Sequence, residues 1–218
     1  MALSWDRRVV PERVLEVLSR SQARVECRIA GGAALSGVHL HHRLSRDVDL
    51  FFDDKPLVRE LSRQLDDVAQ TSGARFRSLR DSGSVVRGSL EFADSQIEID
   101  LVYEPSARVA ERDQVEGLTV ESLADLRANK LTCLLSRSEP RDLVDLYFLD
   151  RAGFPPESDL AIALSKDGGI DPGILAHLLR DFPLAPLPQL LVSLTTEELT
   201  AYRDDLAQRF RYSSLPRE

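Results

Sequence analysis

The sequence predicts an α+β fold in which a mixed β-sheet with flanking helices is followed by a helical C-terminal part. Three observations predict it. Residues 24–29 and 47–52 alternate apolar and polar side chains with the period of two expected of half-buried strands. Residues 75–103 read as successive strands of an antiparallel meander, separated by the turn signals "DSGS" and "ADSQ". From residue 121 onward the apolar residues follow a helical pattern instead.

The same change of pattern predicts two parts within the 218 residues. We expect a core at residues 1–120 and a helical part at residues 121–218 that packs on it. A chain of this length can form one core with a smaller helical annex, because domains usually run to about 100–200 residues.

Within the first part, "PERVLEVLSR" predicts a helix opened by Pro11, since proline is tolerated in a first helical turn. The strand that follows places Val25, Cys27 and Ile29 on one face and three charged residues, including Arg28, on the other. It stops at Gly31-Gly32, after which "AALSGVHLHHRL" predicts a short helix. The acidic strand "RDVDLFFDD" comes next, and "PLVRELSRQLDDVAQ" predicts a longer helix.

In the helical part, "ESLADLRANKLTCLLSR" predicts the first helix and "DPG" at Asp171 marks the start of a later one. The segment "TTEELTAYRDDLAQRFR" predicts a final amphipathic helix with an acidic first turn and a basic last turn, as the helix dipole favours.

The net charge and the apolar runs exclude two classes of protein. A formal charge of −8 argues against a protein that coats nucleic acid through a general basic surface, although a local basic patch remains compatible with it. No apolar run approaches the roughly 20 residues needed to cross a bilayer, and the first 20 residues have no continuous apolar core of a signal peptide. We therefore expect a cytoplasmic protein with no membrane partner.

The acidic strand carries the first candidate site. Asp47 and Asp49 are two residues apart on a strand, so both side chains leave the same face about 6–7 Å apart. A second strand, "SQIEIDLVYEP", contributes Asp100, with Glu98 on the same side. If the two strands are neighbours, three carboxylates converge, which suits the divalent ions of phosphoryl transfer. We interpret Glu98 as exposed, and side chains on a solvated face are the alternative for Asp47 and Asp49.

Gly31-Gly32 is a candidate phosphate turn, because it closes a strand and opens a helix whose backbone amides could receive an anion. The alternative is a simple tight turn. One short helix connects this turn to the acidic strand, which favours the functional interpretation.

Lys130 is anomalous by its position. At 100° per residue it lies in the middle of a helical stripe that also contains Leu126 and Leu134. A lysine centred on an apolar stripe must reach solvent, meet a carboxylate or face an anion. Two hypotheses follow: contact with a phosphate, or a structural ion pair with Asp142 or Asp145 of the next helix.

Other charged residues have weaker claims. His39, His41 and His42 are interpreted as the surface of a short helix, because no carboxylate or cysteine completes a metal site with them. Arg43 and Arg46 flank the acidic strand and could hold phosphate. A basic region on the meander, either a surface that follows a nucleic-acid backbone or an ordinary charged face, is formed by Arg75, Arg77, Arg80 and Arg87.

The motifs in their order resemble a known family. "GGAAL", "HHRLSRDVDLFF", "IEIDLV", "ANKLTCLLSR" and "PRDLVDLYFL" are similar to the AbiEii/AbiGii-type nucleotidyltransferases, relatives of the MenT toxins within the DNA polymerase β-like nucleotidyltransferase superfamily. The resemblance covers about residues 28–150. Their order is more specific than any single motif.

The resemblance implies an enzyme that moves a nucleotidyl group from a nucleoside triphosphate to an acceptor hydroxyl with Mg²⁺ or Mn²⁺. It implies Asp47, Asp49 and Asp100 as metal ligands and, with Lys130, as the catalytic residues. The nucleotide-binding residues it implies are Gly31, Gly32, Ser45, Arg46 and Lys130. The implied partners are an RNA acceptor, particularly tRNA, and an antitoxin protein. A small aminoglycoside-like alcohol as acceptor, or a non-catalytic module that binds nucleotide or a partner, is the alternative.

Overall fold

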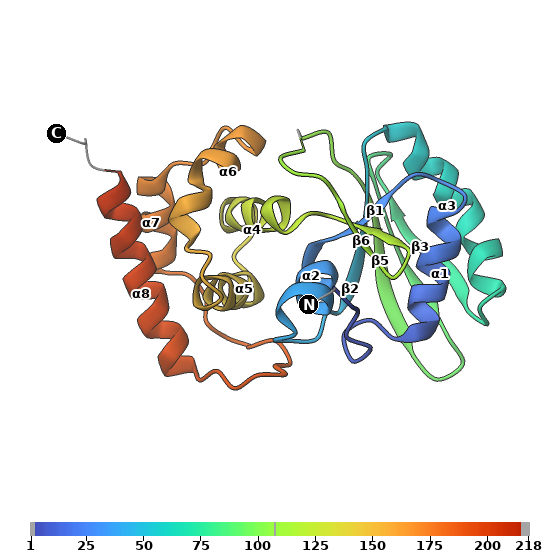
Figure 1. Ribbon diagram of the computed structural model, residues 1–218, viewed down its shortest axis with the longest axis horizontal. Coiled ribbons are helices and arrows are strands. Elements are labelled where there is room, and N and C mark those ends of the chain that lie inside the picture. The colour runs from blue at the N-terminus through green and yellow to red at the C-terminus, as the bar shows by residue number, and fades with distance from the viewer. Residues whose placement is uncertain (1–2, 107, 215–218) are drawn as a thin grey trace. The chain divides into compact units, whose positions relative to one another are not determined.

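The computed structural model describes residues 3–106 and 108–214. It divides into two compact units, the first made of Met1–Pro105 and Glu111–Ser122 and the second of Ser106–Ala110 and Leu123–Glu218. The first unit contains the whole β-sheet, and the second contains helices α4 to α8 (Figure 1).

In the part of the chain that the structure describes, the sheet is mixed and has seven strands in the order β3-β4-β5-β2-β1-β7-β6. The pairs β2–β5 and β1–β7 are parallel, and the other neighbouring pairs are antiparallel. This confirms the predicted fold class. The strands are β1 (Arg28–Ala30), β2 (Asp47–Phe52), β3 (Arg75–Asp81), β4 (Val85–Glu91), β5 (Gln96–Tyr103), β6 (Asp113–Val115) and β7 (Leu118–Val120).

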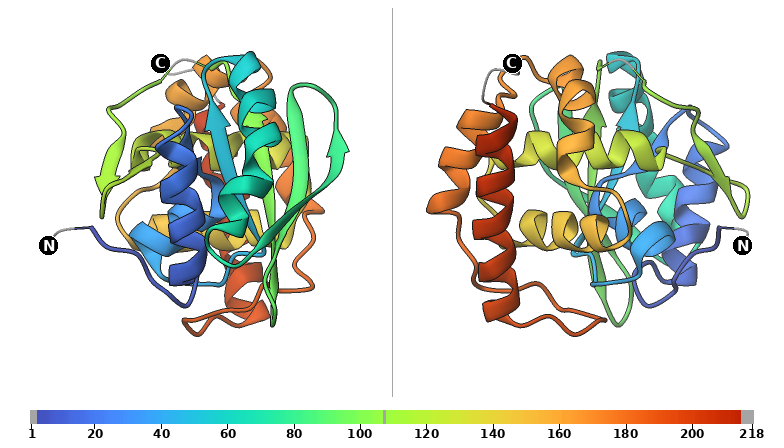
Figure 2. Two further views of the ribbon diagram at one scale, coloured as in Figure 1. Left: turned by 90° about the vertical axis from the view of Figure 1, so that its right-hand side faces the viewer. Right: turned by 60° about the vertical axis from the view of Figure 1, so that its left-hand side comes forward.

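Two helices, α1 (Glu12–Gln22) and α3 (Lys55–Gln70), lie side by side against one face of the sheet (Figure 2). The two helices cover an apolar face of the sheet. In β2 every second residue faces this side, and these residues, Val48, Leu50 and Phe52, are fully buried. The aspartates of β2 therefore leave the opposite face. One face of the acidic strand therefore packs in the core, and the other face carries Asp47 and Asp49.

The meander predicted for residues 75–103 is confirmed, because β3, β4 and β5 pair consecutively and antiparallel. β3 lies at the edge of the sheet. A tight turn at residues 82–84 joins β3 to β4, with Gly83 at a φ of +81°.

Two features of the first unit differ from the expectation. The alternation placed Arg28 on the exposed face, but this residue is buried and pairs with Glu121 and, at 2.6 Å, with Asp53. Two carboxylates supplied by distant segments compensate the charge of the buried guanidinium. The β6–β7 hairpin, whose turn has positive φ at Glu116 and Gly117, was not predicted at all.

The segment between β1 and β2 is less regular than predicted. It begins as a four-residue helix α2 (Gly31–Ala34), continues as a π-helix (Leu35–Leu40) and ends at His41 with a φ of 52°. His42 lies beyond the helix and is completely buried, and the His39 side chain is only 6% exposed, so the interpretation of the three histidines as helix surface was wrong for both residues.

The second unit is helical, as predicted. Asp171 caps α7 by accepting a hydrogen bond from the Ile174 amide at 2.9 Å, and Thr195 forms a capping box with Glu198 at the start of α8. None of the helices in the described residues combines the length and apolar character needed to cross a bilayer. The α-helices are α4 (Leu123–Ser136), α5 (Pro140–Arg151), α6 (Leu160–Lys166), α7 (Pro172–Arg180) and α8 (Thr196–Ser213), and a 3₁₀ turn covers Pro156–Asp159.

Candidate functional site

The three predicted aspartates lie on adjacent strands of the first unit. β2 and β5 run parallel in a register that places Asp49 opposite Asp100 and Asp47 opposite Glu98. Asp100 is only 6% exposed, whereas Glu98 is exposed as expected. The sheet therefore places Asp47, Asp49 and Asp100 on one face, as the sequence predicted, and their convergence on metal ions stays a prediction.

Asp100 already has a cationic partner. Arg87 lies opposite it on β4, and its Nε donates to both carboxylate oxygens at 3.0 and 3.1 Å while its Nη2 donates at 2.7 Å. The Arg87 side chain is 56% exposed, so the charged group lies over the carboxylate from the solvent side. The pKa of Arg87 is raised by its hydrogen bond to Asp100 and by the charges of Asp100, Glu98 and Asp47.

The glycine turn lies directly against the acidic strand. Gly31 has a φ of +64°, and a Cβ at this position would lie 1.8 Å from Oδ2 of Asp49. A Cβ at Gly32 would lie 2.7 Å from Nη2 of Arg43 and 3.1 Å from Oγ of Ser45. Only residues without side chains allow the turn to approach the carboxylates so closely.

Ser45, Arg46 and Arg43 precede the acidic pair in the sequence, and the structure places them differently relative to the site. Ser45 donates a hydrogen bond from Oγ to Oδ1 of Asp47 at 3.3 Å, so it orients one of the candidate ligands. Arg46 is exposed. Arg43 is 2% exposed and lies against Gly32, with its backbone held by Ser36 Oγ. It is the arginine of this segment that contacts the glycine turn, and the sequence offered no signal to choose it over Arg46.

The donor set fits a hard divalent cation, because the carboxylates are oxygen ligands. The missing side chain at Gly31 lets Oδ2 of Asp49 lie directly against the turn. Within residues 3–106 and 108–214, however, no three His, Cys, Asp or Glu side chains are close enough together to form a metal site. The contacts of Arg87 with both oxygens of Asp100 occupy the ligand atoms that the third carboxylate would offer.

Alanine at Gly31 tests how tightly the turn and the carboxylate are packed. We expect Gly31→Ala to lower the free energy of unfolding by about 3 kcal/mol, because it combines a strained φ with a clash against Asp49. Gly73 has a similar φ of +71° with no atom within 4 Å of its would-be Cβ, so Gly73→Ala is the matched control. It should cost only about 1 kcal/mol of backbone strain. Equal losses in urea unfolding would contradict the close approach.

Lys130 belongs to a buried ionic cluster in the second unit. It is 3% exposed, and its Nζ lies 3.1 Å from Oδ1 of Asp142 and 2.7 Å from Oδ2 of Asp145. Arg137 donates to both oxygens of Asp142 at 2.8 and 3.0 Å. The structure thus shows the ion pair that was one of the two hypotheses for this lysine, and contact with a phosphate stays a prediction.

The cluster makes the stability of the protein sensitive to acid. Burial alone would raise the pKa of the Asp142 carboxyl, but the charge of Lys130 and the hydrogen bond from Arg137 outweigh it, and the pKa is lowered. A carboxyl with a lowered pKa in the folded state contributes stability above its unfolded pKa of about 3.9 and loses it as the pH falls further. We expect the free energy of unfolding to fall between pH 5 and pH 3, with a shallower slope in Asp142→Asn. The free energy of unfolding is measured by urea titration at each pH. An identical dependence on pH in the wild type and in Asp142→Asn would contradict this role of Asp142.

Comparisons with known proteins bear on the chain as a whole. Its fold resembles that of JHP933 from Helicobacter pylori, with a TM-score of 0.61 at 20% identity over 96% of this chain and 94% of that one. It also resembles MenT4, a nucleotidyltransferase toxin from Mycobacterium tuberculosis H37Rv, with a TM-score of 0.59 at 17% identity over 93% of this chain and 82% of that one. The search of curated proteins gave no match.

The family model named "Nucleotidyl transferase AbiEii toxin, Type IV TA system" matches residues 13–216. This match spans both units, and it confirms the resemblance drawn from the motifs and the expectation of a nucleotidyltransferase. The chain therefore belongs to the AbiEii family of nucleotidyl transferase toxins.

Proposed function

We propose that this protein transfers a nucleotidyl group from a nucleoside triphosphate to a hydroxyl of an RNA acceptor, with tRNA as the leading candidate. The observation that carries the proposal is the pairing of Asp49 with Asp100 across parallel strands, with the Gly31 turn against the same carboxylates. The acceptor oxygen would attack the α-phosphorus, the bond from that phosphorus to the bridging oxygen would break, and pyrophosphate would leave.

Each residue of the site has a proposed role. Asp47 and Asp49 would hold Mg²⁺ or Mn²⁺, which would neutralise charge on the triphosphate and lower the pKa of the attacking hydroxyl. Asp100 would complete this ligand set and accept the hydroxyl proton. The proposed contacts to the nucleotide come from Gly31, Gly32, Ser45, Arg46 and Lys130. Catalysis would rest on positioning and charge stabilisation.

Arg87 must leave Asp100 for the third carboxylate to act, and we propose that this arginine competes with the metal ion. Arg87→Gln should then lower the half-saturating concentration of Mn²⁺ about two- to fivefold, because a partly exposed ion pair contributes up to about 1 kcal/mol. Titration calorimetry without nucleotide measures this directly. The control is Arg80→Gln, which removes the cross-strand neighbour of Arg87 and should leave the affinity unchanged. Weaker Mn²⁺ binding by Arg87→Gln would show that the arginine supports the site instead.

The acceptor class is tested by incubating the protein with each labelled nucleoside triphosphate in the presence of total RNA or of a mixture of aminoglycosides. We expect label in RNA. Label in the aminoglycosides alone would overturn the RNA acceptor and leave nucleotidyl transfer intact. No label in either would contradict the proposed reaction.

A toxin of this family also implies an antitoxin as partner, and we propose that a small neighbouring gene encodes it. Expression of the protein alone should slow growth, and co-expression of that gene should restore it. Growth that is slowed equally by Asp49→Ala would separate toxicity from nucleotidyl transfer and contradict the proposal.

A further inference from the structure

A groove on the first unit carries three cations on one side of a helix. It is a hollow of about 760 Å³ lined by α3 and by Gly83 of the β3–β4 turn, and we call it the α3 groove. Lys55, Arg59 and Arg63 contribute positive charge from successive turns of α3, about 6 Å apart along the helix. The other lining residues are Pro56, Glu60 and Gln64.

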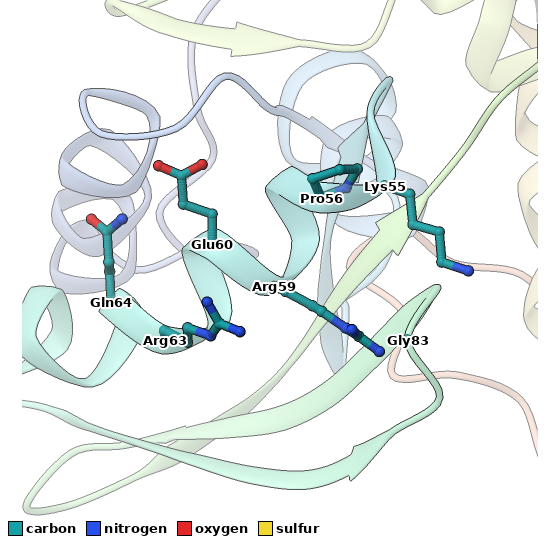
Figure 3. Close-up of a pocket in the computed structure, with 7 residues that line it drawn as sticks. All are labelled: Lys55, Pro56, Arg59, Glu60, Arg63, Gln64 and Gly83. Carbon is teal, nitrogen blue, oxygen red and sulfur yellow. The ribbon is translucent and has the colours of Figure 1, made fainter.

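The side chain of Arg59 and the carboxylate of Glu60, which both line the α3 groove, point in different directions. Figure 3 shows Arg59 directed toward Gly83 at the β3–β4 turn, whereas Glu60, which also lines the groove, points away from the turn. Nη2 of Arg59 lies 3.1 Å from the place that a Cβ at Gly83 would take, so the guanidinium lies over the turn because this residue has no side chain. The wall of the groove that faces the hairpin is therefore cationic.

The cations of the α3 groove are not used within the protein. Within residues 3–106 and 108–214, no carboxylate forms an ion pair with Lys55, Arg59 or Arg63, and all three are exposed. Like charges at i and i+4 destabilise a helix by about 0.2–0.5 kcal/mol per pair. The like-charged pairs Lys55–Arg59 and Arg59–Arg63 thus do not stabilise α3.

A second explanation for surface arginines does not apply to these residues. The exposed arginines of β3, such as Arg75 and Arg77, can protect the edge of the sheet against pairing with another chain. Lys55, Arg59 and Arg63 lie on a helix, which has no unpaired edge to protect.

The α3 groove and the candidate carboxylates lie on opposite faces of the sheet, because α3 packs on the face that buries Val48 and Leu50 and the aspartates leave the other face. The turn at residues 82–84 separates the α3 groove from a smaller hollow of about 270 Å³ that is lined by Arg80, Ser82, Val85 and Arg87. Arg87 in turn contacts Asp100. Cations therefore lie on both sides of the hairpin turn, and a ligand that contacts both hollows must pass around this turn to reach Asp100.

We propose that the α3 groove binds the sugar-phosphate backbone of the acceptor RNA while its reacting hydroxyl reaches Asp100. This rests on the proposed function and adds a binding surface to it. A repeated cation every helical turn suits a chain with regularly spaced phosphates. Arg80 and Arg87, beyond the turn, suit a long polyanion that passes around the edge of the sheet toward Asp100. The net charge of −8 repels polyanions elsewhere, which makes a local groove the place of contact.

The test compares two triple variants in RNA binding followed by fluorescence anisotropy at several salt concentrations. The groove variant is Lys55→Gln, Arg59→Gln, Arg63→Gln. The matched control is Arg20→Gln, Arg24→Gln, Arg180→Gln, which removes three exposed cations outside the groove. The probe is labelled total tRNA. We expect the groove variant to bind about tenfold or more weakly at low salt and to show a salt slope reduced by about 2, whereas the control keeps the wild-type values.

Two further measurements keep the outcomes distinct. Both variants are checked for wild-type melting temperatures and for wild-type Mn²⁺ binding, which report on the fold and on the carboxylate site. Equal RNA affinity in the groove variant and the control would overturn the groove, even if nucleotidyl transfer to RNA persists. Wild-type protein that binds polyglutamate through these cations but does not bind tRNA would assign the groove to an acidic protein and overturn the RNA proposal.

Discussion

Asp49→Ala should reduce the rate of nucleotidyl transfer by about a thousandfold, which corresponds to about 4 kcal/mol of transition-state stabilisation. The substitution would remove a carboxylate ligand of the metal ions, and this carboxylate also lies against the glycine turn. Asp49 is the residue on which the two halves of the site converge: it lies opposite Asp100 and its Oδ2 lies where a side chain on Gly31 would be. The rate of label transfer at saturating nucleotide and metal ion measures the effect.

The control for Asp49→Ala is Glu98→Gln. It removes the same charge from the same region of the sheet, on an exposed side chain two residues from Asp100. We expect its rate to remain within about threefold of wild type, since an exposed charge is screened by solvent and salt. If Asp49→Ala and Glu98→Gln lose activity equally, the loss reflects general charge and the metal assignment is wrong.

Lys130→Ala should lower the free energy of unfolding by about 3 kcal/mol, because it removes one partner from a buried ionic cluster and leaves the carboxylates of Asp142 and Asp145 with less compensation. Both aspartates are completely buried, and the ammonium lies within 3.1 Å of each. Urea unfolding followed by circular dichroism measures the loss.

A matched variant separates stability from nucleotide contact. The side chain of Lys166, also in the second unit, is 5% exposed, and its Nζ lies 2.7 Å from Oδ1 of Asp125. Lys166→Ala should destabilise the protein to a similar extent. If Lys130 also contacts phosphate, only Lys130→Ala should weaken nucleotide binding in calorimetry, by about tenfold. Equal nucleotide affinity in the two variants would leave Lys130 with a structural role alone.

The sequence predicted those parts of the fold that depend on local periodicity. The acidic strand is recognisable because Val48 and Leu50 alternate with the aspartates, and α3 is recognisable because its apolar residues recur every three or four positions. Asp171 and Thr195 start helices through caps that their own neighbours complete. In each case the deciding interactions lie within a few residues.

The parts that were missed depend on partners far apart in the chain. The buried Arg28 forms an ion pair with Glu121, which is 93 residues later in the chain. Asp100 forms its ion pair with Arg87, which lies opposite it on the neighbouring strand β4. Periodicity gives the face of a strand but not its neighbours, so neither pair could be derived from one sequence. The three carboxylates lie on one face of the sheet, as predicted, and their role as metal ligands stays a prediction. Arg87, which holds Asp100, was predicted to belong to a surface.

The position of the label in the product tests the central claim most directly. The protein is incubated with RNA and with a nucleoside triphosphate that carries the label on either the α- or the γ-phosphorus. Nucleotidyl transfer predicts that the α-label enters the RNA and that the γ-label is released in pyrophosphate. Entry of the γ-label into RNA, or no entry of the α-label into any acceptor, would contradict the proposed reaction.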